Sequence, residues 1–77
     1  MAVEEKRFTS LINTHQGLIH KICIMYENDP DVRNDLFQEI VFQLWKSFTS
    51  FRGEAKITTW MYRIALNTAI SRFRKQT

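Results

Sequence analysis

The sequence contains little of what loops, β-sandwiches and membrane spans require. It has one proline and two glycines among 77 residues, and 44% of its residues are hydrophobic. That composition excludes a disordered segment, disfavours a β-sandwich and is typical of one small all-α domain. No apolar run approaches the ~18 residues that a membrane span needs. The first residues also lack the apolar stretch of a signal peptide, so we expect a soluble, cytoplasmic protein without membrane insertion.

Cysteine and histidine are equally scarce. Cys23 is the only cysteine, so no disulfide can form within the chain, and we interpret it as a small buried hydrophobe in a reducing compartment. His15 and His20 are five residues apart, so they point in different directions on a helix and do not predict a metal site. With no glycine-rich phosphate loop and no nucleophile near a base, the sequence predicts neither an enzyme nor a bound cofactor.

Negative charge is almost absent from the last third of the chain. Residues 1–51 hold five Lys and Arg against seven Asp and Glu, a net charge of −2. Residues 52–77 hold six Lys and Arg against one Glu, a net charge of +5. A basic end joined to a mildly acidic body indicates two different partners, one of them a polyanion.

Hydrophobic spacing of three and four residues predicts three helices, and hence a small three- to four-helix bundle. The first spans residues 3–26. Gly17 weakens the middle of this helix by up to ~1 kcal/mol, and we interpret it as the place where another helix crosses closely. Asp29 is expected to cap the second helix, with Pro30 at its first position and Phe48 at its end. The third is expected over residues 57–75.

The second helix has two different faces. Its predicted core side holds Leu36, Phe37, Ile40, Val41, Leu44 and Phe48. The opposite side holds two large aromatics among charged residues, Phe42 and Trp45, which indicates a protein-binding patch. The alternative is that Trp45 packs under the first helix or the following loop.

The third helix is predicted to bury Ile57, Met61, Ile64 and Ala65. Leu66, Ile70 and Phe73 lie on nearly the opposite side, so the helix is either wrapped on two sides or meets something outside the chain. A further stripe shares one face at spacings of three and four residues: Trp60, Arg63, Asn67, Ser71 and Arg74. Guanidinium and amide groups are poor core material but suit phosphates and base edges, so the stripe indicates nucleic-acid binding. The alternative is a solvated helix face.

Two sequence segments carry a family resemblance. Residues 51–55 read Phe-Arg-Gly-Glu-Ala and residues 59–65 read Thr-Trp-Met-Tyr-Arg-Ile-Ala, followed by Asn67. Upstream, Asp-Leu-Phe-Gln-Glu occupies residues 35–39, and Leu-Trp-Lys follows at residues 44–46. In this order and spacing the segments resemble conserved region 2 of bacterial sigma-70-type factors, with the extracytoplasmic-function group as the closest branch. The resemblance covers about residues 8–74.

The resemblance implies that residues 1–77 form a domain that docks on core RNA polymerase and recognises and melts the promoter minus-ten element in transcription initiation. By motif match, Asp35, Gln38 and Glu39 would bind the coiled-coil of the polymerase β′ subunit, and the face analysis adds Phe42 and Trp45. The loop over residues 51–56 would hold an unpaired base of the non-template strand. The expected DNA contacts are Arg52, Gly53, Glu54, Ala55, Lys56, Thr59, Trp60, Arg63, Asn67, Ser71 and Arg74.

The same family carries a second helix-turn-helix domain, region 4, which this sequence lacks. We therefore interpret the chain as the N-terminal part of a longer factor, and the resemblance implies an anti-sigma protein as a further partner. A helical protein-interaction module without a DNA-binding role is the alternative function. A duplex-binding helix-turn-helix repressor is disfavoured, because the loop before the third helix is too long and charged for the tight turn of that motif.

Overall fold

Three α-helices build the described part of the chain. A computed structural model describes residues 2–51, 53 and 55–76. The helices are α1 (Ala2–Tyr26), α2 (Pro30–Phe48) and α3 (Ile57–Gln76), and no strand occurs among the described residues. The predicted all-α class is therefore confirmed, and each helix boundary lies within one residue of its predicted position.

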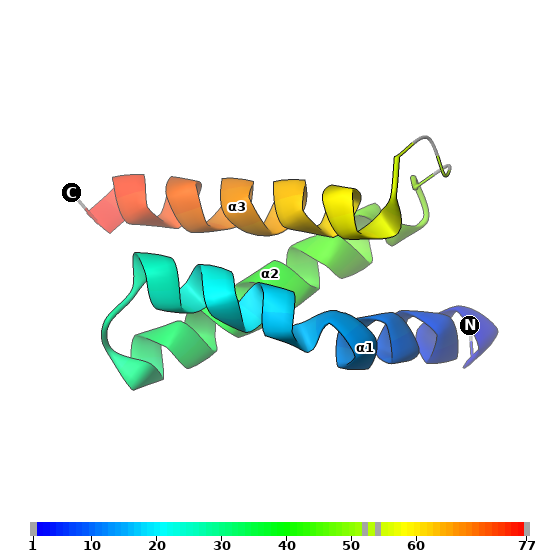
Figure 1. Cartoon of the computed structure of the whole chain (residues 1–77), viewed down its shortest axis with the longest axis horizontal. Helices are drawn as coiled ribbons and strands as arrows, with labels where there is room; N and C mark the ends of the chain where they lie inside the picture. Colours follow the sequence, from blue (N-terminus) through cyan, green and yellow to red (C-terminus); the bar gives the residue numbers. More distant parts are fainter. Residues whose placement is uncertain (1, 52, 54, 77) are drawn as a thin grey trace.

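Each helix packs against both others. α3 runs alongside α1, and α2 crosses behind them (Figure 1). The start of α1 and the connection between α2 and α3 lie at one end of the molecule, while the end of α3 and the connection between α1 and α2 lie at the other. The molecule measures 37 × 22 × 19 Å, so every helix has one side in the core and one side near solvent.

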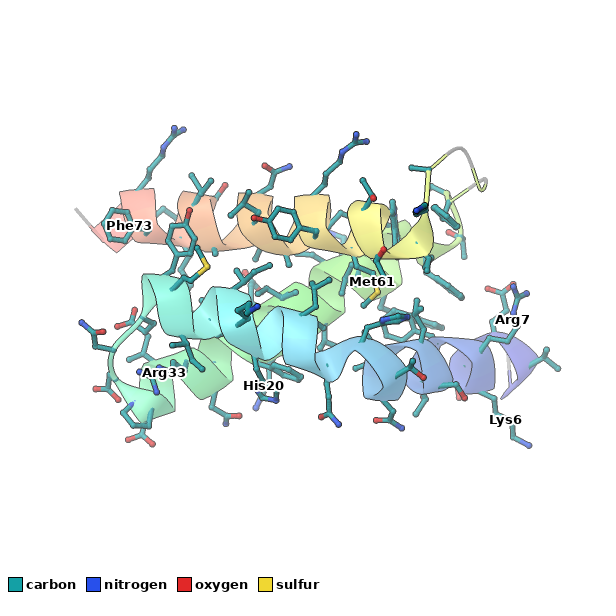
Figure 2. All side chains as sticks on the ribbon, in the orientation of Figure 1. Lys6, Arg7, His20, Arg33, Met61 and Phe73 are labelled. Atoms are coloured by element: carbon teal, nitrogen blue, oxygen red, sulfur yellow. The ribbon has the colours of Figure 1, made fainter. Side chains whose placement is uncertain are left out.

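The core takes residues from all three helices. Figure 2 shows Met61 in the space between α3 and the helices beneath it. On α2 the predicted core side is confirmed: three of its residues are buried and the other three, half-buried, pack against them. The buried hydrophobic side chains are Phe8, Ile19, Ile22, Cys23, Leu36, Ile40, Leu44, Met61, Ala65 and Ala69.

Burial determines the chemistry of the single cysteine. Cys23 is 1% exposed, and this burial raises the pKa of its thiol. The nearby charges of Arg33 and Arg72 act in the opposite direction but are smaller effects. The neutral thiol is thus favoured, which agrees with the interpretation of Cys23 as a small core residue.

The bend in α1 lies near the glycine but does not have the predicted cause. His15 has non-helical backbone angles, φ −115° and ψ 18°, where two helical segments meet. Gly17 is exposed, and a β-carbon added there would meet no heavy atom within 4 Å. The predicted close crossing at Gly17 is therefore wrong. The glycine instead adds to the conformational freedom of the helix two residues beyond the bend.

The second half of α3 is enclosed from two sides. α3 contacts both α1 and α2, Leu66 and Ile70 are half-buried, and Ala69 is fully buried. Phe73 stays 52% exposed, and its ring lies 6.3 Å from that of Tyr26 on α1. Of the two alternatives for this half of the helix, the structure favours wrapping on two sides.

The predicted cap of α2 is confirmed. Asp29 has an extended backbone, φ −80° and ψ 122°, and its Oδ1 accepts a hydrogen bond from the backbone N–H of Asp31 at 2.9 Å. Pro30 occupies the first turn, where its missing N–H costs no hydrogen bond. The side chain of Asp29, three residues after α1 ends, thus satisfies a backbone N–H in the first turn of α2.

We expect Asp29→Ala to lower the free energy of unfolding by about 0.5–2 kcal/mol, because the donor on Asp31 loses its acceptor. Asp29→Asn is the matched control, since the amide oxygen can still accept that bond while the charge is removed. Urea denaturation followed by circular dichroism would compare the two. An equal loss in both variants would assign the effect to the charge and contradict the capping role.

Candidate nucleic-acid and protein interfaces

The outer face of α2 forms one wall of a shallow groove against α1. Gln38, Phe42 and Trp45 line this groove, and α1 contributes three residues opposite them. Phe42 is 54% exposed and Trp45 is 37% exposed. We call this the α1/α2 groove; its lining residues are Glu5, Phe8, Thr9, Gln38, Val41, Phe42 and Trp45.

Trp45 is both a packing residue and a surface residue. Its ring centroid lies 5.0 Å from that of Phe8 on α1 and 6.4 Å from that of Phe48. The alternative of packing under the first helix is therefore correct for one part of the ring, and the remainder stays open to the groove. Phe42 has a simpler environment: the Lys46 ammonium lies 5.4 Å from its ring centroid, a cation–π contact at the surface.

The structure divides the predicted polymerase-binding residues. Asp35 is exposed and lines neither this groove nor the one between α2 and α3. Glu39 faces α3, where it shares a groove with Asn67 and Ser71. Only Gln38, Phe42 and Trp45 are thus brought together in the α1/α2 groove. Glu5 and Thr9 were missed by sequence reasoning, because no local pattern indicates which turn of α1 crosses α2.

The stripe on α3 is largely as predicted. Arg63, Asn67, Ser71 and Arg74 are all exposed along one face, and Thr59 precedes them in the exposed first turn. Trp60 differs from the expectation for this stripe, because it is half-buried and packs against the core.

Trp60 is held by two other aromatic rings. Its centroid lies 6.3 Å from that of Phe48 and 5.1 Å from that of Phe51. The ring of Phe51, which follows α2, thus lies against the first turn of α3. That contact could not be read from helical periodicity, which treats α3 in isolation.

A polar groove runs between α2 and α3, and the stripe opens into it. Asn67 and Ser71 line this groove beside the cations Arg72 and Lys75, and Glu39 is the one anion among its described lining residues. The hydroxyl of Thr68, another lining residue, donates to the carbonyl of Ile64 at 2.7 Å and so is satisfied within its own helix. The remaining lining residues are Gln43, Ser47 and Ile64. Amide, hydroxyl and cationic groups side by side suit a sugar–phosphate backbone.

The predicted base-holding loop contains a glycine whose backbone conformation would be strained for any other residue. Gly53 has φ +75°, a left-handed conformation that side-chain-bearing residues rarely adopt. At the ends of the loop, Phe51 N–H donates to the carbonyl of Phe48 at 3.2 Å, and Trp60 N–H donates to the carbonyl of Lys56 at 3.0 Å. Ala55 is half-buried and Lys56 exposed. The predicted contacts Arg52 and Glu54 lie outside the described residues.

No group of three or more His, Cys, Asp or Glu within the described ranges could hold a metal ion. His20 stacks on Phe37 of α2, with ring centroids 4.4 Å apart and an interplanar angle of 23°. In the same part of the chain, no helix combines the length and apolarity needed to cross a bilayer.

Comparison with known proteins identifies the family of the chain. The family described as Sigma-70 region 2 matches residues 11–77. The chain belongs to this family. It is 36% identical over 66 residues to the ECF RNA polymerase sigma-E factor of Haemophilus influenzae, and 35% identical over 66 residues to that of Escherichia coli K12. It is 30% identical over 66 residues to the RNA polymerase sigma-H factor of Pseudomonas aeruginosa.

Each of these alignments covers 86% of the chain and 34% of the relative. The chain therefore spans about one third of the length of the sigma factors it matches. No solved structure matches it. The predicted resemblance to region 2 of an extracytoplasmic-function sigma factor is confirmed, and the three-helix structure is an example of that domain.

Proposed function

We propose that this sigma region 2 domain binds core RNA polymerase and recognises and melts the promoter minus-ten element. The observation that carries this proposal is the separation of two exposed surfaces on one small bundle. One is an aromatic groove between α1 and α2, and the other is the polar, cationic face of α3. A protein partner suits the first surface and a nucleic acid suits the second.

The α1/α2 groove fits the coiled-coil of the β′ subunit. A helix laid in a groove is held by a few large apolar anchors, and Phe42 and Trp45 supply them at the surface of α2. Gln38, in the same groove, offers both a donor and an acceptor. Asp35 and Glu39 are exposed on α2 but lie outside this groove, so a polymerase contact at either one needs a partner that extends beyond the groove.

The α3 face fits the minus-ten DNA. Opening a base pair costs roughly a few kcal/mol, and capture of the flipped base by a loop offsets that cost. Gly53 brings the backbone of the loop close to a ligand without a side chain in the way. Arg63 and Lys75 neutralise phosphates, while the Asn67 amide can read a base edge.

The whole factor is proposed to act in the bacterial cytoplasm, with a further domain for the upstream promoter element and an anti-sigma protein that controls it.

We expect the domain to bind single-stranded minus-ten oligonucleotides more tightly than the matching duplex, and more tightly still with the β′ coiled-coil fragment present. Arg63→Ala should reduce the slope of log K against log salt by about 1, because one phosphate contact is lost. Fluorescence anisotropy at several salt concentrations would measure both quantities on a pool of labelled strands.

Lys21→Ala is the matched control. Lys21 is also an exposed cation, but it lies on α1, outside the stripe, the loop and both grooves. Its replacement should leave the salt slope unchanged. If both variants reduced the slope equally, the DNA would be bound by net charge alone. If no oligonucleotide or coiled-coil bound, the chain would be a helical interaction module with another partner.

A further inference from the structure

Five aromatic rings meet at the end of the bundle where α2 leads into α3. Phe8 contacts Trp45 and Phe48, with centroids 5.0 and 5.3 Å apart. Phe48 then contacts Trp60, and Trp60 contacts Phe51, at 6.3 and 5.1 Å. We call this set, Phe8, Trp45, Phe48, Phe51 and Trp60, the aromatic cluster. It joins α1, α2, the connection and α3 at a single place.

The cluster closes the loop over residues 51–56 across its base. Backbone hydrogen bonds hold each end separately: Phe51 is tied to the last turn of α2, and Lys56 is tied to the first turn of α3. These bonds are local and do not join the two ends to each other. The contact between the rings of Phe51 and Trp60 spans them, because Phe51 opens the loop and Trp60 lies in the first turn after it.

The position of Trp60 fits this closing role better than contact with DNA. Its ring is half-buried and packs against the core, whereas the four other residues of the predicted stripe are exposed. It also lines neither the polar α2/α3 groove nor the α1/α2 groove. A base that stacked on the ring of Trp60 would have to displace the ring of Phe48 or Phe51 from it. Asn67 and Ser71, in contrast, open directly into the polar groove.

A loop whose two ends are held together binds its ligand more tightly than a loop whose ends are free to separate. A loop that is already held in its binding conformation does not pay the cost of ordering when the ligand arrives. Gly53 adds freedom to the unbound loop, because its left-handed conformation is one of many that glycine can adopt. A constraint at the base of the loop therefore has most effect on the ligand that the loop itself contacts.

We propose that Trp60 and Phe51 are positioning residues, whose ring contact holds the two ends of the loop over residues 51–56 together for the capture of an unpaired base. Trp60 does not itself stack on that base. This inference rests on the proposed function, in which the loop captures a base of the minus-ten strand. It reassigns Trp60 from a direct DNA contact to a residue that acts through the loop.

The test uses a series of labelled single strands in which each base in turn is replaced by an abasic site. The parent strand is the tightest binder recovered from a random pool, and the β′ coiled-coil fragment is present throughout. For the unchanged chain, one abasic position should weaken binding by roughly tenfold or more, which marks the captured base. Trp60→Leu and Phe51→Leu should both reduce that positional effect to within about twofold while leaving the salt slope unchanged.

Two further variants separate positioning from other roles. Trp60→Phe keeps an aromatic ring against Phe51 and should restore most of the positional effect. Arg63→Ala should behave in the opposite way to the leucine variants, with a smaller salt slope but the positional effect intact. Thermal melting by circular dichroism identifies any variant that fails to fold, and Phe51→Leu tests the same contact from the loop if Trp60→Leu is unfolded.

The outcomes distinguish the inference from the proposed function beneath it. If Trp60→Leu removes the positional effect and folded Phe51→Leu does not, Trp60 stacks on the base and the positioning role is wrong. If both folded variants retain the positional effect, the ring contact does not hold the loop. If the unchanged chain binds no single strand, the proposed function fails, and the inference fails with it.

Discussion

Replacing Leu44 with alanine is expected to lower the free energy of unfolding by about 2–5 kcal/mol. Leu44 is 0% exposed and lies on the core side of α2, in one buried cluster with Ile40 and Met61. Removing its branched end leaves a cavity that the three helices cannot fill without moving. Since a domain this small has only a few kcal/mol of net stability, we expect a large fraction of the variant to be unfolded at 37 °C.

Chemical denaturation followed by circular dichroism would measure the loss, and tryptophan fluorescence would report on the aromatic cluster in the same samples. Ile24→Ala is the matched control, because it removes the same number of carbon atoms from a side chain that is 57% exposed. We expect it to change stability by within about 0.5 kcal/mol. Similar losses at Leu44 and Ile24 would contradict the packing of α2 described above.

The second large effect is expected on binding. Phe42→Ala should weaken binding to the β′ coiled-coil fragment by about 2 kcal/mol or more, which is roughly a 30-fold rise in Kd. The reason is that a half-exposed aromatic in the α1/α2 groove is available as an anchor, and its removal leaves the partner's apolar surface uncovered. Because Phe42 is 54% exposed, the loss of domain stability should be small. Isothermal titration calorimetry would give the affinity.

Phe73→Ala is the appropriate comparison for that measurement. Phe73 is the same residue type at nearly the same exposure, 52%, but it lies near the end of α3 against Tyr26 (Figure 2). We expect its removal to leave coiled-coil binding unchanged. An unchanged affinity for Phe42→Ala would refute the assigned face. Trp45→Ala is less informative, because Trp45 also packs on Phe8 and Phe48, so its loss combines binding with stability.

Local signals in the sequence were accurate. The spacing of Leu36, Ile40 and Leu44 correctly predicted the buried side of α2, because one helical period relates these residues without any reference to the other helices. Asp29 and Pro30 correctly predicted where α2 begins, because a cap involves residues only two positions apart. The two family segments likewise identified the domain from residues close together in the chain.

Predictions that required knowledge of a neighbouring helix were less accurate. The sequence predicts a crossing at Gly17, yet a β-carbon added there would meet no heavy atom within 4 Å. Trp60 shares a helical face with Arg63 and Asn67, but it packs against Phe51 and is half-buried. The roles of the individual binding residues, in both the polymerase and the DNA surfaces, stay predictions.

The sequence by itself determined the three helices, the core side of α2, the concentration of positive charge toward the end of the chain and the sigma region 2 family. Each of these depends on composition or on residues within a few turns of one another. Only the tertiary structure decided that Glu39 faces α3 while Gln38, its neighbour in the chain, faces α1. The reason is geometric: adjacent residues on a helix point about 100° apart. Because α1 and α3 both pack against α2, one of these neighbours lines the groove with α1 and the other lines the groove with α3.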